Sequence, residues 1–349
     1  MKKLTSLLLA IVMLFSFAAC SPAEPDNGGA PDNGGAPDGG AEVGTTYPVT
    51  ITDHANRSVT IEDKPERLVS GYYISTSALI ALDLDSKLVG IEAKANKRAI
   101  YSLSAPELID LPNVGTAKEF DLEGCIALAP DLVILPVKLK SAAESLSALD
   151  IDVILVNPEN QQLLEEMISL IGKVTNTEAK ADELFGFISA QRDRLTAELA
   201  DSSKPKVYLA GNSALLSTAG AAMYQSDMIS LAGGENVAAE ITDTYWVETN
   251  YEQLLTWNPE YIILASDATY TVEDVLNDAN LAECDAVING NVFKMPSEAE
   301  AWDSPVPSGI LGSVWLSAVL HSDICTEEAA ADIIDSYYET FYGFDYSEK

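Results

Sequence analysis

One structural phrase occurs twice in the chain, and this repeat limits the folds that are possible. The first copy, residues 120–135, reads FDLEGCIALAPDLVIL, and the second, residues 249–264, reads TNYEQLLTWNPEYIIL. In each copy a Glu (Glu123, Glu252) opens a short apolar helical pattern, and a Pro then stops it. A four-residue apolar strand follows, which is the alternation of helix and buried strand found in covered parallel sheets. The repeat therefore predicts two similar α/β halves that can hold a ligand between them.

Residues 1–20 are predicted to be a targeting segment outside the fold. Lys2 and Lys3 precede the apolar stretch Leu7–Phe17, which is too short for a dependable membrane span. Small residues then precede Cys20, which resembles the lipobox of bacterial lipoproteins, in which the cysteine is acylated. The alternative is an ordinary secretory signal with a chance cysteine. Lipidation at Cys20 is favoured, because the segment that follows has the composition of a tether.

Residues 21–46 contain the sequence PDNGGA twice and PDGGA once. Short repeats of Pro, Gly, Asn and Asp cannot bury a core, so this segment is predicted to be a flexible acidic linker. The body from residue 47 onward is long enough for two domains with a large core. The predicted location is therefore extracytoplasmic, with the body tethered to the outer face of the cell membrane.

The charge of the chain narrows the choice of partner. There are 54 acidic and 20 basic residues, giving a net charge of −34. Such a chain is unsuited to nucleic acids or anionic membrane surfaces. Against this background the basic clusters at residues 94–98 and 138–140 hint at an anionic ligand. The alternative is that they are solvated side chains on an acidic surface.

Hydrophobic patterning predicts how the body is organised. An antiparallel hairpin is expected at Tyr47–Thr52 and Ser58–Glu62. A first lobe follows with strands Leu68–Ser70, Leu88–Ile91, Leu132–Leu135 and Val153–Val156 and helices Ser75–Leu82, Asp121–Leu128 and Ser141–Leu149. A second lobe is expected with strands near Val207–Ala210, Tyr261–Leu264 and Val292–Met295, and the chain ends in helices Leu311–Leu320 and Glu328–Phe341.

A long helical stretch, Gln161–Asp201, lies between the two lobes. Gly172 is expected to interrupt it, and Thr177 followed by Glu178 is a plausible helix start. A helix of about 20–25 residues spans roughly 30–38 Å and acts as a stiff strut, so a small hinge motion is expected. The predicted segments are 1–20 signal peptide, 21–46 linker, 47–173 N-terminal lobe, 174–203 interlobe helix, 204–320 C-terminal lobe and 321–349 C-terminal helix.

Seven short passages along the body match, in order and spacing, those of a known protein family. They are Ile51–His54 with Arg57, Pro65–Val69, Pro112–Gly115, Leu128–Ile134, Ala232–Val237, Glu252–Leu255, and Leu311–Gly312 with Trp315–Leu316. Together they make the chain resemble the substrate-binding proteins of ABC importers for ferric siderophores, haem and cobalamin. The resemblance implies two α/β lobes joined by one long α-helix, with the ligand cleft between the lobes. The resemblance also implies that the chain is a binding protein and not an enzyme.

The resemblance also assigns roles to the repeated glutamates. Members of the family carry one surface Glu on each lobe that docks onto arginine pockets of the membrane permease, and these roles fall on Glu123 and Glu252. The alternative is that both are ordinary acids of a first helical turn, which complement the helix dipole. The expected partners are the permease and a small-molecule metal chelate. The protein is expected to be a monomer that contacts the membrane only through its lipid.

In this architecture the ligand is expected against loops that leave the carboxyl ends of the strands. Several of these loops carry aromatic residues that could stack on a flat or greasy ligand. For each one, core packing is an open alternative. The candidate ligand residues are Tyr72, Tyr73, Lys138, Met223, Tyr224, Tyr245, Trp246, Tyr270, Trp302 and Asp303.

Direct metal binding has little support in the sequence. His54 and His321 are the two histidines, and neither has a second nitrogen or sulfur ligand nearby. We therefore expect no intrinsic cofactor and a chelated cargo: a ferric siderophore first, then a corrinoid (cobalamin) or haem. Iron or haem ligation by tyrosine stays open. A disulfide between Cys284 and Cys325 is possible in this compartment.

Two other classes of function stay open at this point. A secreted acidic hydrolase could use paired carboxylates, but no spacing singles out such a pair, and no GxSxG, HExxH or phosphate-loop motif is found. A surface lipoprotein that binds another protein through its aromatic loops is the second alternative.

Overall fold

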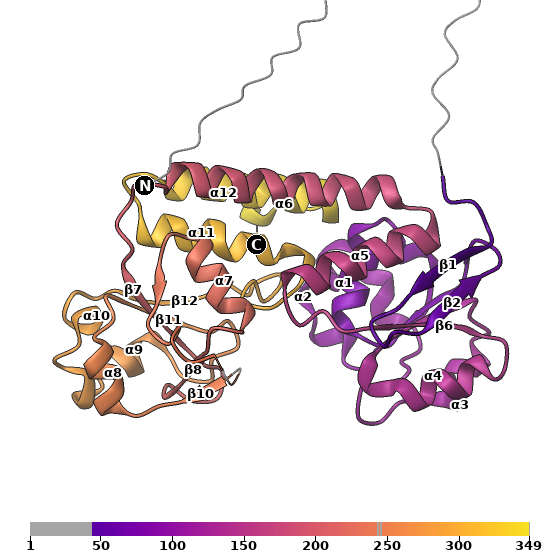
Figure 1. Ribbon diagram of the computed structural model, residues 1–349, viewed down its shortest axis with the longest axis horizontal. Coiled ribbons are helices and arrows are strands. Elements are labelled where there is room, and N and C mark those ends of the chain that lie inside the picture. The colour runs from indigo at the N-terminus through magenta and orange to yellow at the C-terminus, as the bar shows by residue number, and fades with distance from the viewer. Residues whose placement is uncertain (1–43, 243, 245, 349) are drawn as a thin grey trace, which may run out of the picture. The chain divides into compact units, whose positions relative to one another are not determined.

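The computed structural model describes residues 44–348, with the exception of residues 243 and 245. The predicted lipidation site Cys20, nearly all of the predicted linker and the candidate ligand residue Tyr245 lie outside the described residues. The described body has two α/β lobes and a long helix that runs from one to the other (Figure 1). This confirms the predicted fold class.

The N-terminal lobe contains a parallel sheet with the strand order β4-β3-β5-β6. All four strands were expected, and every residue of β3 and β5 is buried because helices cover the sheet. The strands are β3 (Leu68–Ser70), β4 (Leu88–Ile91), β5 (Leu132–Pro136) and β6 (Asp152–Val156), and the helices are α1 (Tyr73–Ala81), α2 (Ala99–Ser104), α3 (Leu122–Ala127), α4 (Lys140–Ser147) and α5 (Gln161–Thr175).

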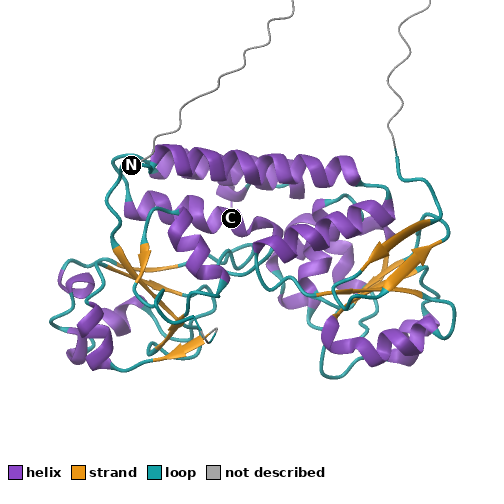
Figure 2. Ribbon diagram, in the orientation of Figure 1, coloured by secondary structure: helices purple, strands orange, loops and turns teal. Residues whose placement is uncertain are grey.

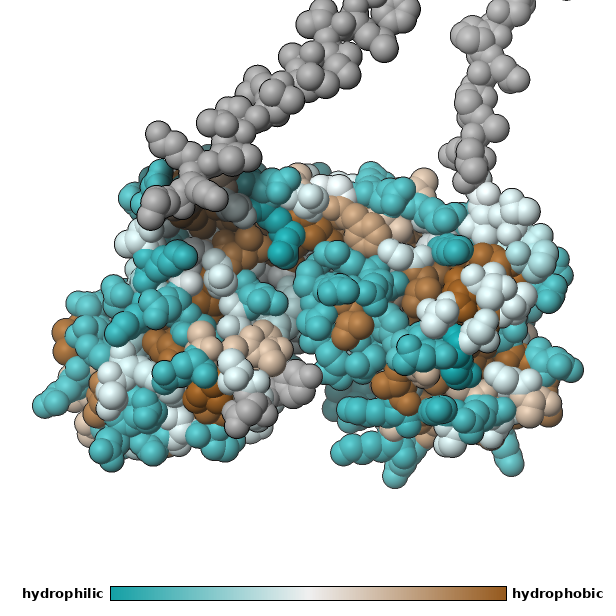
Figure 3. All heavy atoms as spheres, in the orientation of Figure 1, coloured by the Kyte–Doolittle hydropathy of each residue, from teal (hydrophilic) through white to brown (hydrophobic). Residues whose placement is uncertain are grey.

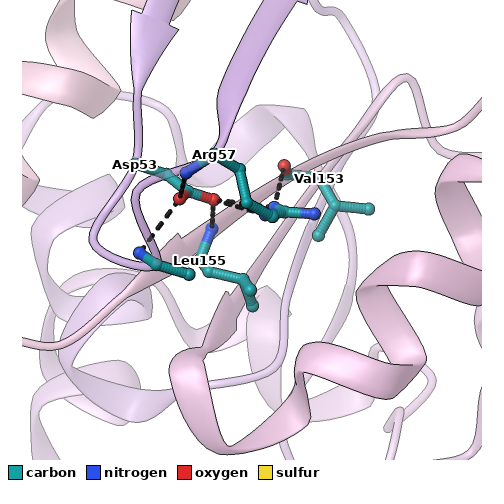
Figure 4. A network of polar contacts seen from close by, with 5 residues as sticks. Asp53, Arg57, Val153 and Leu155 are labelled. Atoms are coloured by element: carbon teal, nitrogen blue, oxygen red, sulfur yellow. Dashed lines mark hydrogen bonds and ion pairs between the residues drawn. The ribbon is translucent and has the colours of Figure 1, made fainter.

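The predicted hairpin is present and is fastened to this lobe by one buried carboxylate. Its strands are β1 (Val49–Thr52) and β2 (Ser58–Ile61). In the turn, Asp53 accepts hydrogen bonds from the backbone N–H groups of Arg57 (2.9 Å) and of Leu155 in β6 (3.1 Å). The Arg57 side chain pairs with Asp53 and also donates to the carbonyl of Val153 (2.7 Å) (Figure 4). The buried charge is therefore paired and fully bonded, as burial demands.

The C-terminal lobe has a mixed sheet with the order β10-β8-β7-β11-β12 and with β9 paired to β7. Strands β7, β11 and β12 are parallel and were expected, whereas the short strands β8, β9 and β10 were not. The strands are β7 (Lys206–Ala210), β8 (Ser217–Ala219), β9 (Glu235–Asn236), β10 (Trp246–Glu248), β11 (Tyr261–Leu264) and β12 (Val292–Lys294), and the helices are α7 (Tyr224–Leu231), α8 (Tyr251–Trp257), α9 (Val272–Leu276), α10 (Asp285–Ile288), α11 (Ile310–Leu320) and α12 (Glu327–Tyr342).

The repeated phrase has the same structure in both lobes. Ala129 (φ 47°) and Asn258 (φ 44°) are both left-handed residues that end the helical turn before the proline. The acid after the proline then binds the backbone at the entrance of the neighbouring strand. Asp131 accepts from the N–H of Arg67 at 2.9 Å, and Glu260 accepts from the N–H of Lys206 at 3.0 Å. Each copy thus sets the register between two parallel strands.

The long helix α6 (Glu178–Glu198) begins after Thr177, as expected, and is about 32 Å long at 1.5 Å per residue. The expected break at Gly172 is wrong. Helix α5 continues to Thr175 and ends at Asn176, which adopts the left-handed conformation. Gly172 instead lets α6 pack closely, because a Cβ atom there would lie 3.2 Å from that of Ala181.

The interlobe helix is not an isolated strut. Helix α11 packs on α6 and on α12, and α12 in turn contacts α1 of the N-terminal lobe. Figures 1 and 2 show α6, α11 and α12 together along one side of the two lobes, with the β1–β2 hairpin at the outer edge of the N-terminal lobe. A cluster of aromatic residues on α12, which includes Tyr337 and Phe341, packs against Phe187 of α6. The helical layer makes the connection between the lobes stiffer than one helix alone.

Three cysteines lie within the described residues, and all are buried free thiols: Cys125, Cys284 and Cys325. The possible disulfide between Cys284 and Cys325 is therefore not formed. None of the helices in the described part of the chain is both long enough and apolar enough to cross a bilayer.

Candidate functional site

A cavity of about 130 Å³ lies where loops of the two lobes meet. The N-terminal lobe contributes Tyr73, which follows β3, and Arg98, which follows β4. The C-terminal lobe contributes Asp267, which follows β11, and Glu300, which follows β12. Every one of these residues comes after the carboxyl end of a parallel strand, which is where α/β folds bind ligands. On the face shown in Figure 3, a notch separates two lobes whose surfaces are mainly hydrophilic.

The size and lining of this cavity favour a small polar ligand. Pockets for drug-sized molecules are typically about 300–1,000 Å³, several times larger than this cavity. Its wall carries a guanidinium, an ammonium group, two carboxyl groups, phenol groups and serine hydroxyls. A ligand held here would be fixed by hydrogen bonds and charge rather than by burial of a large apolar surface.

Arg98 is one of two basic residues that line this space, and the other is Lys97. Arg98 is half-buried, and its guanidinium carbon lies 4.1 Å from the centre of the Tyr73 ring. Such a cation–π contact holds the group in place without using its N–H donors. Within the part of the chain that the structure describes, no hydrogen bond or ion pair occupies those donors. The side chain is therefore positioned and still free to bind an acceptor.

A buried carboxyl group positions the segment that carries Arg98. Glu92, just after β4, accepts hydrogen bonds from the Tyr101 hydroxyl (2.6 Å) and from Thr76 Oγ1 (2.7 Å). Burial raises the pKa of Glu92. These bonds tie α1 and α2 to the end of β4, and Arg98 is the residue that precedes α2. The two helices thus hold Arg98 and Tyr73 against each other.

Two loops of the C-terminal lobe form the facing wall. The carboxylate of Asp303 accepts from Ser266, from its N–H at 2.9 Å and from its hydroxyl at 2.6 Å. This pair fixes the loop after β11 that carries Asp267. The backbone N–H of Ile100 donates to the carbonyl of Ala299 at 3.1 Å, so the two lobes touch directly beside the cavity.

The structure places the predicted ligand residues in several different environments. Tyr73 lines the cavity, and Tyr72 packs edge-to-face on it with ring centres 5.4 Å apart. Met223 is half-buried just before α7, and Tyr224, the first residue of that helix, is only 6% exposed. Burial raises the pKa of Tyr224, which therefore stays a neutral phenol. Of these four side chains, the structure brings Tyr73 into the cavity and Tyr72 next to it.

Trp302 and Asp303 belong to the framework of the C-terminal lobe. Trp302 is 1% exposed, and its indole N–H donates to the Tyr338 hydroxyl at 2.8 Å. Asp303 is buried, and both of its carboxylate oxygens are used by Ser266. Neither residue is among those that line the cavity.

The remaining predicted ligand residues lie around the lobes. Lys138 is exposed in the turn after β5, outside the cavity. Trp246 is 39% exposed at the start of the edge strand β10. The Tyr270 hydroxyl donates to the carbonyl of Gly211 at 2.7 Å, which bridges two loops of the C-terminal lobe.

Sequence patterns gave only part of this site. Arg98 belongs to one of the two predicted basic clusters, whereas Tyr101, Asp267 and Glu300 were not singled out. The available signal was position, because Asp267 and Glu300 closely follow the predicted strands Tyr261–Leu264 and Val292–Met295. Which of those loops meet across the cleft depends on the packing of the two lobes, and this cannot be read from local patterns.

A larger groove, of about 830 Å³, lies on the N-terminal lobe. It is lined by residues of that lobe and by Phe185 of α6, so it is not between the lobes. His54 lies in its wall, and its Nδ1 accepts a hydrogen bond from the backbone N–H of Asn157 at 2.8 Å. Burial lowers the pKa of His54, so the ring is held neutral. The smaller cavity differs from this groove in that it joins both lobes at the strand ends.

The two repeated glutamates occupy equivalent exposed positions. Glu123 is in the first turn of α3, and Glu252 is in the first turn of α8. Both helices are capped by another residue: Asp121 accepts from Gly124 N–H and Asn250 from Gln253 N–H, each at 2.9 Å. Helices α3 and α8 both lie on the side of their lobe away from α6 (Figure 1).

Metal coordination by the protein itself finds no basis in the described region. Among residues 44–348 without 243 and 245, no group of three or more His, Cys, Asp or Glu side chains is placed to hold an ion. The neutral tautomer of His54 carries its proton on Nε2, because Nδ1 accepts a hydrogen bond. This nitrogen therefore has no lone pair for a metal.

Two α/β lobes, a connecting helix and a polar cleft at the strand ends define a two-lobed solute-binding protein. The family model for periplasmic binding proteins matches residues 68–299, and the chain belongs to that family. It is a substrate-binding component of an ABC importer that works outside the cytoplasm, and it is not an enzyme.

Curated relatives differ in the ligand that their names give. The molybdate-binding protein MolA of Haemophilus influenzae is 28% identical over 323 residues, covering 85% of this chain and 91% of that protein. The uncharacterized ABC transporter substrate-binding lipoprotein YvrC of Bacillus subtilis is 28% identical, covering 74% and 78%. A cobalamin-binding protein of Halobacterium salinarum is 25% identical, covering 80% and 70%.

Solved structures are similar over the same span. A periplasmic solute-binding protein from Veillonella parvula superposes with a TM-score of 0.74 at 25% identity, covering 85% of this chain and 93% of that one. MolA bound to molybdate superposes with a TM-score of 0.73 at 27% identity, covering 85% and 99%.

Proposed function

We propose that this chain is the lipid-anchored binding subunit of an importer for a small oxyanion. The observation that carries the proposal is the Arg98 guanidinium, stacked on Tyr73 with its donors unoccupied in a cavity of about 130 Å³. A planar fork of five N–H donors suits the oxygens of an anion. The similarity to a protein that binds molybdate supports this class of cargo. The lipid anchor rests on Cys20 and on the tether-like composition after it.

A metal chelate is the second candidate cargo. A corrinoid is supported by the similarity to a cobalamin-binding protein. A ferric siderophore and haem, which were also expected from the sequence, are chelates of the same kind. A ligand of that size needs more room than the cavity offers, so the lobes would have to open. The aromatic side chains of Tyr72 and Trp246 are the candidates to contact it.

Delivery to the permease is assigned to Glu123 and Glu252. Both are exposed, one on each lobe, and neither is the residue that caps its helix. Two acids on separate lobes can contact two permease subunits at once. The distance between the two acids, and so the fit to the permease, then depends on whether the lobes are closed around cargo. This docking role remains part of the proposal.

Ligand-induced stabilisation tests the cargo class. The purified body is melted with molybdate, sulfate, phosphate, a ferric siderophore, cyanocobalamin or haemin. A true cargo at 100 times its Kd adds about 2.7 kcal/mol to the free energy of unfolding. We expect saturable stabilisation by one or more of the oxyanions. Stabilisation by a chelate alone would replace the oxyanion with the second candidate.

A further inference from the structure

The wall opposite Arg98 carries acidic groups, which is unexpected for an anion site. Glu300 and Asp267 line the same cavity as Arg98 and Lys97. If both carboxyl groups were ionised, they would cancel the two cations, and an arriving dianion would meet no net positive charge. The charge state of these carboxyl groups therefore controls what the cavity can bind.

Of the two carboxyl groups, Glu300 is the one whose protonation is affected by burial. It is buried, whereas Asp267 is exposed. The Ser308 hydroxyl donates a hydrogen bond to Glu300 Oε2, and no ion pair to Glu300 is found in the described part of the chain. An unpaired carboxylate in such a place is costly, so the protonated form is favoured, and burial raises the pKa of Glu300.

Three groups favour a negative charge on Glu300, but each has a smaller effect than burial. They are the hydroxyls of Ser308 and Ser77 and the guanidinium of Arg98 in the N-terminal lobe. Helix α12 presents phenols, Tyr337, Tyr338 and Tyr342, whose own pKa values are raised by burial. Burial also raises the pKa of the Tyr73 phenol of α1, which faces Glu300 and Asp267. All of these phenols are neutral at physiological pH.

We propose, on the basis of the proposed function, that Glu300 is a specificity-determining residue that holds a proton while the cleft contains its cargo. One carboxyl oxygen accepts from Ser308, and the O–H of the other donates to an oxygen of the bound oxyanion. The proton comes from solvent, so binding one fully ionised oxyanion takes up as much as one proton. Arg98 and the Glu300 O–H together form a site of donors, which favours oxyanions that only accept hydrogen bonds.

The sign of the pH dependence follows from linkage. An anion bound next to Glu300 favours the protonated carboxyl, so the Glu300 pKa is higher in the complex than in the free protein. Between those two values the affinity falls as the pH rises, by at most about tenfold per pH unit. Above both values the carboxylate is charged in both states and the affinity is low and constant.

Calorimetric titration with sodium molybdate tests the proposal. The heat is measured in two buffers with different ionisation enthalpies, from about pH 6 to about pH 8.5, which gives the number of protons taken up per anion. For the natural protein we expect an uptake that approaches one proton in part of this range. For Glu300→Gln, which keeps the shape and the Ser308 contact, we expect no uptake and a Kd that no longer changes with pH.

A second variant identifies which carboxyl group takes the proton. Asp267→Asn removes the other acid of the cavity, and proton uptake should persist in it. Thermal unfolding of both variants checks that they are folded. Molybdate binding with no proton uptake, or with equal uptake in Glu300→Gln, would overturn this inference alone. If none of the three proteins binds molybdate, sulfate or phosphate at any pH, the proposed function is overturned, and this inference with it.

Discussion

Ser77 Oγ and the hydroxyl of Tyr342 lie 2.9 Å apart, and this contact joins the N-terminal lobe to the C-terminal helix. Ser77 is on α1 of the N-terminal lobe, and Tyr342 is the last residue of α12. The Tyr342 hydroxyl also donates to the Ser77 carbonyl at 3.3 Å. Both residues are buried. The lobes are thus linked by α6 and by a second, non-covalent contact, which restricts the hinge.

Removing the hydroxyl should loosen this link. In Tyr342→Phe the buried Ser77 hydroxyl loses a partner, so we expect the free energy of unfolding to fall by about 1–2 kcal/mol. Urea denaturation measures this change, and the distance between spin labels on the two lobes reports the hinge. The control is Tyr346→Phe, whose hydroxyl donates to the exposed Glu298. Equal effects of the two variants would show that the Ser77 contact does not restrain the lobes.

The carboxylate of Asp53 should be among the most sensitive positions of the N-terminal lobe. It is 3% exposed and binds Arg57 and the backbone of Leu155. Asp53→Ala leaves a partly buried guanidinium without its partner, so we expect a loss of about 3–5 kcal/mol in urea denaturation. Asp63→Ala, at an exposed position of the same lobe, should stay within about 0.5 kcal/mol. A small loss for Asp53→Ala would mean that the hairpin is not fastened by this group.

His54 should make the body less stable in acid. Its Nδ1 accepts the N–H of Asn157, and burial lowers its pKa from the ordinary value of 6.5. The unfolded chain therefore binds a proton at a higher pH than the folded one does, so stability is complete above about pH 6.5 and falls as the pH drops below it. Melting temperatures from about pH 5 to about pH 8 measure this in the natural protein and in His54→Asn. An unchanged acid slope in the variant would assign the effect to other groups.

Permease docking and cargo binding should be separable. Glu123→Ala combined with Glu252→Ala is expected to abolish uptake in cells and to leave the cargo Kd unchanged, because neither residue lines the cavity. The matched control is Glu144→Ala with Glu273→Ala, which removes the same charge from exposed positions of the two lobes. Loss of affinity in the first pair, or equal loss of uptake in both pairs, would rule out the docking assignment.

The fold was accessible from the sequence because its signals are local. Strands β3, β5 and β11 are fully or almost fully buried, so they are continuous apolar runs bounded by polar residues. The repeat marked two equivalent helix–strand units, and Asp131 and Glu260 do make equivalent contacts. Strands β8 and β10 were not predicted because Ser217–Ala219 and Trp246–Glu248 mix polar and apolar residues and lack the apolar run that marks a buried strand such as β3.

The site was less accessible because it is assembled from loops of both lobes. Trp302 and Arg98 illustrate the difficulty. Both follow predicted strands, yet the tryptophan turns into the aromatic core on Tyr338 and the arginine turns toward the cleft. Lys138 lies at the end of β5 and is a basic residue like Arg98, but it is exposed outside the cavity. Tertiary packing decides between these outcomes, and one sequence does not encode it in a local pattern.

The Kd of molybdate for Arg98→Gln, beside the natural protein and Lys138→Gln, tests the central claim most directly. Hydrogen bonds to a charged group contribute about 1.5–3 kcal/mol, so Arg98→Gln should weaken binding by about 10- to 150-fold. Lys138→Gln removes a basic residue of the same lobe and should change the Kd by less than about twofold. Equal affinity of Arg98→Gln and the natural protein, or a larger loss in Lys138→Gln, would show that the cargo is not held in the cleft beside Tyr73.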